Sequence, residues 1–134
     1  MKMFLNGTAM SGQADHVHLH GAALLGPATT APCYRFYAVR GEFPGLVPVA
    51  DGGGPVDGEV YELPEDVWTQ SLAPAEPSEL DLGEVQLEDG STVFAMILDL
   101  TRVDPDDLED ITALCGWRAY LTSVGAAVPT ARTT

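Results

Sequence analysis

The segment FLNGTAM, residues 4–10, changes from apolar to turn-forming residues within a few positions. Its first two residues continue the apolar start of the chain, and this short run predicts a β-strand. Asn6 and Gly7 then favour a turn. Two interpretations follow: the glycine gives the strand a tight exit, or the loop forms a nest of backbone N–H groups that binds an anion. In such a nest, Gly7 would let the anion approach the backbone closely and would adopt an unusual φ angle.

Strand-like segments dominate the rest of the chain. In YRFYAV (residues 34–39), alternate side chains fall on opposite faces, as in a β-strand. The dipeptide Asp89-Gly90, between two apolar runs, suits a hairpin turn. The expected strands cover residues 1–5, 22–30, 34–39, 45–50 and 56–63, followed by the two arms of a hairpin within residues 80–100.

One helix is expected between these strands, in PEDVWTQSL (residues 64–72). Its first turn holds a proline and two acidic residues, which suit the positive end of a helix. Pro74 and Pro77 are expected to end it, because proline removes a backbone donor and disfavours helix before it. Residues 104–124 predict one or two further short helices. The predicted fold class is α+β: a small mixed β-barrel with one inserted helix and a short helical C-terminus.

Length and charge limit the kinds of protein that this chain can be. Its 134 residues suit one domain, which we expect to span residues 1–122, with residues 123–134 as a flexible tail. The 20 acidic and 6 basic residues give a net charge of -14. This balance argues against nucleic acid and against anionic membrane surfaces, because both require a basic face.

Two further observations predict a cytoplasmic location. No apolar run approaches the ~18 residues of a membrane span, and MKMFLNG (residues 1–7) is too short for a signal peptide. Cys33 and Cys115 form no C-x-x-C motif, which favours reduced thiols, while a disulfide between them stays open.

Several segments, in order, resemble a known family. LNGTAM (residues 5–10) is similar to the Y-G-S-L loop at the end of the first strand of the gamma-glutamylcyclotransferase-like fold, and FPGLVPV, VDGEVYELP and LAPAEP follow in the order of that fold. The chain resembles most closely the C-terminal domain of allophanate hydrolase and its stand-alone relatives, over about residues 3–122. The segments that carry this resemblance are GPATTAPCYRFYAV, PGLVPV, GEVYELP, LGEVQLEDGSTV and DITALCGWRAYL.

The resemblance implies a site. The loop after the first strand would offer its backbone N–H groups to a substrate carboxylate or carbonyl, and the general base would be a glutamate shortly after the helix. That glutamate is Glu76, with Glu79 as an alternate. Arg35 is a candidate for binding a substrate carboxylate, whereas Arg118 is expected to be a structural clamp. The expected substrate-binding residues are Asn6, Gly7, Thr8, Ala9, Met10 and Arg35.

Three functions stay open, and none of them is expected to need a cofactor. In cyclotransfer, the α-amine of a substrate with amide and carboxylate groups attacks its own γ-carbonyl and yields 5-oxoproline. The allophanate hydrolase resemblance implies a decarboxylase-like activity of the urea pathway, but Ala9 stands where the motif of that domain carries a histidine. The third function is a non-catalytic module that binds a metabolite or an amidase partner. A homodimer is also open.

Three histidines alternate in HVHLH (residues 16–20), and on an extended segment they would share one face. Such spacing occurs in zinc and copper sites. Because no second ligand cluster follows, a polar entry segment is the favoured interpretation of His16, His18 and His20, and no metal is expected.

Overall fold

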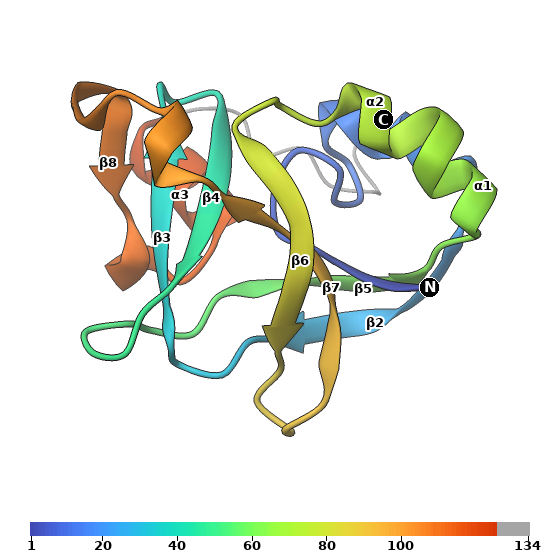
Figure 1. The fold of residues 1–134 in the computed structure, drawn as a ribbon, viewed down its shortest axis with the longest axis horizontal. Helices are drawn as coiled ribbons and strands as arrows, with labels where there is room; N and C mark the ends of the chain where they lie inside the picture. The colour runs from blue at the N-terminus through green and yellow to red at the C-terminus, as the bar shows by residue number, and fades with distance from the viewer. Residues whose placement is uncertain (126–134) are drawn as a thin grey trace.

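Eight strands form one curled mixed sheet in the computed structural model, which describes residues 1–125 (Figure 1). A few short helices accompany the sheet, so the predicted α+β class is confirmed. The strands are β1 (Lys2–Leu5), β2 (Ala23–Thr29), β3 (Tyr34–Val39), β4 (Phe43–Pro48), β5 (Asp57–Glu62), β6 (Leu80–Gln86), β7 (Thr92–Leu98) and β8 (Leu108–Asp110).

Strand β1 lies in the middle of the sheet, whose order is β2-β5-β1-β7-β4-β3-β8. It pairs antiparallel with β5 and parallel with β7, and β7 is also parallel to β4. Strand β6 forms the predicted hairpin with β7, and Gly90 in its turn has a φ angle of 90°. This order brings the end of β1 close to β4, although the two strands are far apart in the sequence.

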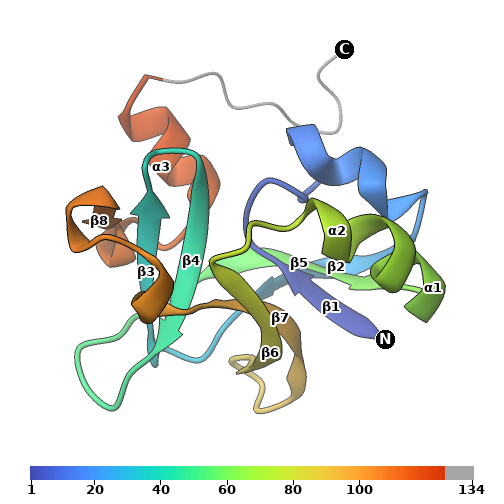
Figure 2. The ribbon, with the colours of Figure 1, turned by 45° about the horizontal axis from the view of Figure 1, so that its top comes forward.

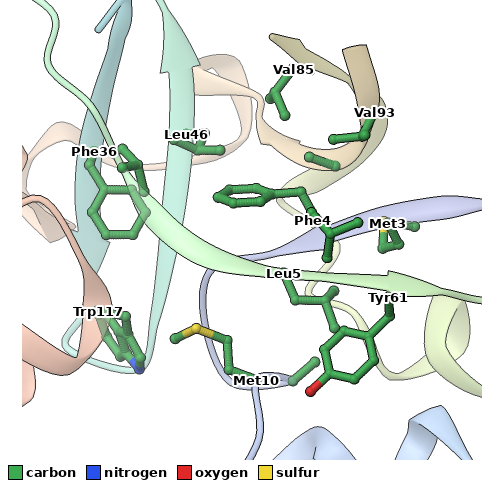
Figure 3. Close-up of a cluster of buried hydrophobic side chains, with 14 of the residues drawn as sticks. Met3, Phe4, Leu5, Met10, Phe36, Leu46, Tyr61, Val85, Val93 and Trp117 are labelled. Carbon is green, nitrogen blue, oxygen red and sulfur yellow. The ribbon is translucent and has the colours of Figure 1, made fainter. Parts of the chain in front are cut away.

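The sheet curls around one main hydrophobic core (Figure 3). Phe4 from β1, Phe36 from β3 and Leu46 from β4 are almost fully buried there. Helix α3 (Trp117–Ser123) adds Trp117 and Tyr120, whose rings stack with centroids 4.9 Å apart. Burying this apolar surface is the main driving force for the curl, because the two halves of the sheet cover each other's inner face.

The predicted helix extends further than expected. Helix α1 (Glu65–Val67), a π-helical turn (Trp68–Leu72) and α2 (Ala73–Ala75) form one continuous helical segment. The prediction that Pro74 ends the helix is therefore wrong: the wider π turn accommodates a residue without a backbone N–H. The segment ends at Glu76, whose extended conformation (φ -73°, ψ 144°) is the one that a following proline favours.

Two other segments differ from the sequence prediction. Residues Ala14–Leu19, which contain most of the histidine motif, form a 3₁₀ helix instead of an extended segment, and this helix packs beside the helical segment of residues 65–75 (Figure 2). Strand β8 was not expected, because it is short and lies in an acidic stretch. Further 3₁₀ turns cover Leu100–Arg102, Pro105–Asp107 and Thr112–Leu114.

The predicted flexible tail begins at residue 123, but α3 includes Ser123. Most of the predicted tail, residues 126–134, lies outside the described residues. Within the described part of the chain, no helix combines the length and the apolarity that a membrane span requires.

Candidate functional site

The N-terminal loop, residues 6–13, leaves the end of β1 and passes directly over β4. A Cβ atom on Gly7 would lie 2.6 Å from Cγ of Pro44, which is closer than side-chain atoms approach one another. Gly7 is not among the glycines with a positive φ angle. The expected unusual φ is therefore wrong. The group that approaches position 7 closely in the structure is Pro44, not a bound anion: position 7 must lack a side chain because Pro44 lies against it.

The backbone N–H groups of this loop fall into two sets. Met10 N donates to the Gly7 carbonyl oxygen at 3.1 Å, and Ser11 N donates to the carboxylate of Glu59 at 2.7 Å. The N–H groups of residues 6–9 have no protein acceptor within residues 1–125. They are thus the donors that a bound molecule could use, and Met10 is not one of them.

A pocket lies between this loop and the end of the helical segment. Its cavity volume is about 30 Å³, within about 370 Å³ of space between the atoms that includes the open mouth. The loop contributes residues 6–9, of which Asn6 and Thr8 are polar, and the rest of the wall is mostly apolar. The lining residues are Phe4, Leu5, Asn6, Gly7, Thr8, Ala9, Phe43, Pro44, Glu76, Pro77, Leu80 and Met96.

Among the residues that the structure describes, Glu76 is the one ionisable residue in that lining. Burial raises the pKa of its carboxyl group to about 7, and the negative charge of Asp15 adds to the increase. Asp15 lies close because its backbone N–H donates to the carbonyl oxygen of Thr8 at 2.8 Å. Near neutral pH, Glu76 therefore exchanges a proton readily, as a general base or acid must.

Three other residues that the sequence singled out lie away from the pocket lining. The carboxylate of Glu79 bonds to Arg40 at 2.8 Å, which lowers its pKa. Arg35 bonds to Asp110 of β8 at 2.6 Å. The side chain of Met10 turns into the core toward Trp117 (Figure 3), where its sulfur accepts a hydrogen bond from Arg118.

The three histidines point to separate partners. His16 Nδ1 lies 3.0 Å from the Ala9 carbonyl oxygen, His20 Nε2 lies 2.8 Å from Ser71 Oγ, and His18 Nε2 lies 3.8 Å from Asp15. On a 3₁₀ helix, residues two apart do not share a face, which separates them. No group of three metal-binding side chains occurs within residues 1–125.

One polar cluster beside the loop was missed by the sequence analysis. Glu59 of β5 accepts hydrogen bonds from Ser11 and from the hydroxyl of Tyr61, and Arg118 of α3 approaches it at 3.7 Å. The residues come from three distant segments, so no local motif unites them. The available signal was weak: Glu59 lies within the predicted strand of residues 56–63, whose other members are buried in the structure at positions 58, 60 and 61.

Known proteins are similar to this chain in fold or in sequence. A uropathogenic E. coli-specific protein has a TM-score of 0.83 at 28% identity, with 90% of this chain and 94% of that chain covered. The urea amidolyase of K. lactis has a TM-score of 0.84 at 29% identity, with 92% of this chain and 8% of that chain covered. A putative gamma-glutamylcyclotransferase of Vibrio cholerae is 38% identical over 68 residues, which cover 51% of this chain.

The fold is thus the gamma-glutamylcyclotransferase-like fold. The family described as the allophanate hydrolase C-terminal domain matches residues 1–122, and the chain belongs to this family. The matched regions span 56% of the Vibrio relative and 8% of the urea amidolyase.

Proposed function

We propose that this chain is a small-molecule enzyme of the gamma-glutamylcyclotransferase-like type, with Glu76 as its general base. The α-amine of a γ-glutamyl amide attacks the γ-carbonyl carbon of the same molecule. A new C–N bond closes the five-membered ring, the original amide C–N bond breaks, and 5-oxoproline and a free amine leave. The substrate is a small molecule with an amide and a carboxylate group.

The observation that carries this proposal is the meeting of Glu76 with the free N–H groups of residues 6–9 in one pocket. Glu76 takes a proton from the attacking amine and returns one to the leaving amine. A pKa of about 7 suits both steps near neutral pH. Because both reacting groups belong to one substrate, the pocket only has to hold the folded conformer.

The free N–H groups of the loop have the second role. They bind substrate oxygen atoms, and in the transition state they stabilise the oxyanion that develops on the γ-carbonyl. Within residues 1–125 the pocket lining includes no lysine or arginine, and the chain carries a charge of -14. Backbone donors are therefore the groups that can hold an anionic oxygen here, since their effect does not depend on net positive charge.

A second candidate is the decarboxylase-like activity that the resemblance implied, and the family match over residues 1–122 favours it. The family motif has a histidine where this chain has Ala9. His16 contacts the Ala9 carbonyl oxygen but is not one of the lining residues, so it does not replace that histidine within the pocket. We therefore place this function second.

The test is turnover of a panel of γ-glutamyl amides, followed by release of 5-oxoproline. Glu76→Gln should lower kcat by about 10²–10⁴-fold, the usual contribution of a general base. Glu65→Gln is the matched control, because Glu65 is an exposed acid on the same helical segment and removal of its charge should leave kcat unchanged. Equal turnover by wild type and Glu76→Gln would remove Glu76 as the base. Carbon dioxide release from an amidase and allophanate, without any 5-oxoproline, would favour the second candidate.

A further inference from the structure

The polar cluster around Glu59 lies on the loop, yet the proposed chemistry does not use it. Only 11% of the Glu59 side chain is exposed, which is unusual for a carboxylate. The backbone N–H of Ser11 donates to Oε1 at 2.7 Å, and the hydroxyl of Ser11 donates to Oε2 at 2.6 Å. Both carboxylate oxygens are thus committed to one residue of the loop.

Arg118 completes the arrangement from α3. One of its terminal nitrogens, Nη2, donates to the carbonyl oxygen of Ser11 at 2.7 Å and lies 3.7 Å from Glu59 Oε2. Both backbone polar groups of Ser11 and its hydroxyl are therefore bound by charged side chains. Hydrogen bonds to charged groups are about twice as strong as those between neutral groups.

The electrostatics of Glu59 keep it ionised. Burial raises the pKa of its carboxyl group, but the hydrogen bonds from Ser11 and Tyr61 and the charge of Arg118 together outweigh this and lower the pKa below its usual value. Glu59 thus acts as a permanent acceptor, unlike Glu76, whose protonation changes near neutral pH.

Because Ser11 follows the pocket-lining residues of the loop, its hydrogen bonds to Glu59 also hold those residues in place. The loop is fixed at residue 7 by its contact with Pro44 and at residue 11 by Glu59. The free N–H groups of residues 6–9 lie mostly between these two points. A loop held at both ends keeps its donors in place before a ligand arrives, which is what stabilisation of an oxyanion requires.

We propose that Glu59 is a positioning residue, which holds Ser11 so that the N–H groups of residues 6–9 line the pocket. This inference rests on the proposed function of that pocket for its effect on catalysis, but the ordering of the loop can be measured without any substrate. Glu59 takes no part in proton transfer.

The experiment compares Glu59→Gln with Glu62→Gln by amide hydrogen exchange and by kinetics. Glu62 lies on the same strand, is exposed and contacts the N-terminal ammonium group instead of the loop. In Glu59→Gln, the amides of Met10 and Asp15, which donate to loop carbonyl oxygens, should exchange at least tenfold faster. The Ile111 amide, which donates to Phe36 at 2.8 Å, should keep its rate. Glu62→Gln should change none of the three.

With an active substrate, Glu59→Gln should lower kcat/KM at least tenfold while the pH of the acidic limb, which Glu76 sets, stays the same. Ser11→Ala should give a smaller effect in the same direction, and Ser11→Thr should restore the wild-type value because it keeps the hydroxyl. Ser11→Ala also provides the test if Glu59→Gln does not fold.

Unchanged exchange of the Met10 and Asp15 amides, or an equal increase at Ile111, would overturn the inference, the second because it shows a general loss of stability. If wild type forms no 5-oxoproline, the proposed function fails, and the exchange rates still decide whether Glu59 orders the loop.

Discussion

Gly7 and Pro44 are in contact so close that a methyl group at position 7 would lie 2.6 Å from Cγ of the proline. The contact joins the end of β1 to β4, two strands that do not pair directly with each other. Gly7→Ala should therefore push the loop away from β4 and cost about 1–3 kcal/mol in the free energy of unfolding, as overpacking does. Urea denaturation measures this cost.

The double variant Gly7→Ala/Pro44→Ala tests the cause. Removing most of the proline ring makes room for the added methyl group, so the two substitutions should be strongly non-additive. Simple addition of the two costs would show that the strain at position 7 has another origin.

Asp15 should control the basicity of Glu76. Its negative charge is one of the two causes that raise the pKa of Glu76 to about 7, after burial. Asp15→Asn removes this charge, so the pKa of Glu76 should decrease and the acidic limb of the pH profile of kcat/KM should move to a lower pH. Asp66→Asn, at an exposed position in α1, is the control. A shift toward higher pH, or equal shifts in both variants, would contradict the assignment.

The sequence was sufficient for strands β1 to β7 and for the two sides of the candidate pocket, because those depend on local patterns and on a resemblance that extends over nearly the whole chain. A strand that ends in Asn6 and Gly7 indicated the loop, and the position of Glu76 just before Pro77 indicated the end of the helical segment. Neither pattern shows that Pro44 is what requires Gly7, since that contact depends on the order of strands in the sheet.

Contacts between distant segments also explain why Arg35 and Met10, which were expected to bind substrate, lie away from the pocket lining. Alternation in YRFYAV correctly places Arg35 on the face opposite Phe36, but it does not show that Asp110 of β8 lies beside it. Met10 follows the loop directly in the sequence, yet the turn between Gly7 and Met10 sends its side chain into the core. Contacts between distant segments decided both cases.

Arg35 offers a direct test of the pocket boundary. Its guanidinium bonds to Asp110 at 2.6 Å, and both side chains are 38% exposed. Arg35→Met should leave KM for a γ-glutamyl amide unchanged and lower the free energy of unfolding by less than about 1 kcal/mol, because exposed ion pairs contribute little. A large increase in KM without a change in kcat would return Arg35 to the substrate-binding residues.

Glu76 should lower the free energy of unfolding near and above neutral pH, where it is ionised and can act as a base. Its pKa is about 7 in the folded chain, against an ordinary value of 4.5. The folded state therefore binds the proton more tightly than the unfolded state does. The favourable contribution of the protonated group is complete below the unfolded pKa and is lost as the pH increases through the folded pKa.

Glu76→Gln, which stays neutral, should not show this loss. Compared with wild type, the variant should gain about 1–3 kcal/mol at pH 8 and little at pH 4.5, where the upper value corresponds to the full shift and the lower one allows for partial exposure to solvent. The difference in unfolding free energy between the two proteins, measured in urea at both pH values, cancels the pH effects of the many other acids. Glu65→Gln, measured in parallel, should show no such dependence. A gain for Glu76→Gln that is equal at both pH values would mean that the carboxylate is solvated as well in the folded chain as in the unfolded one, and the pocket would then hold no base of raised pKa.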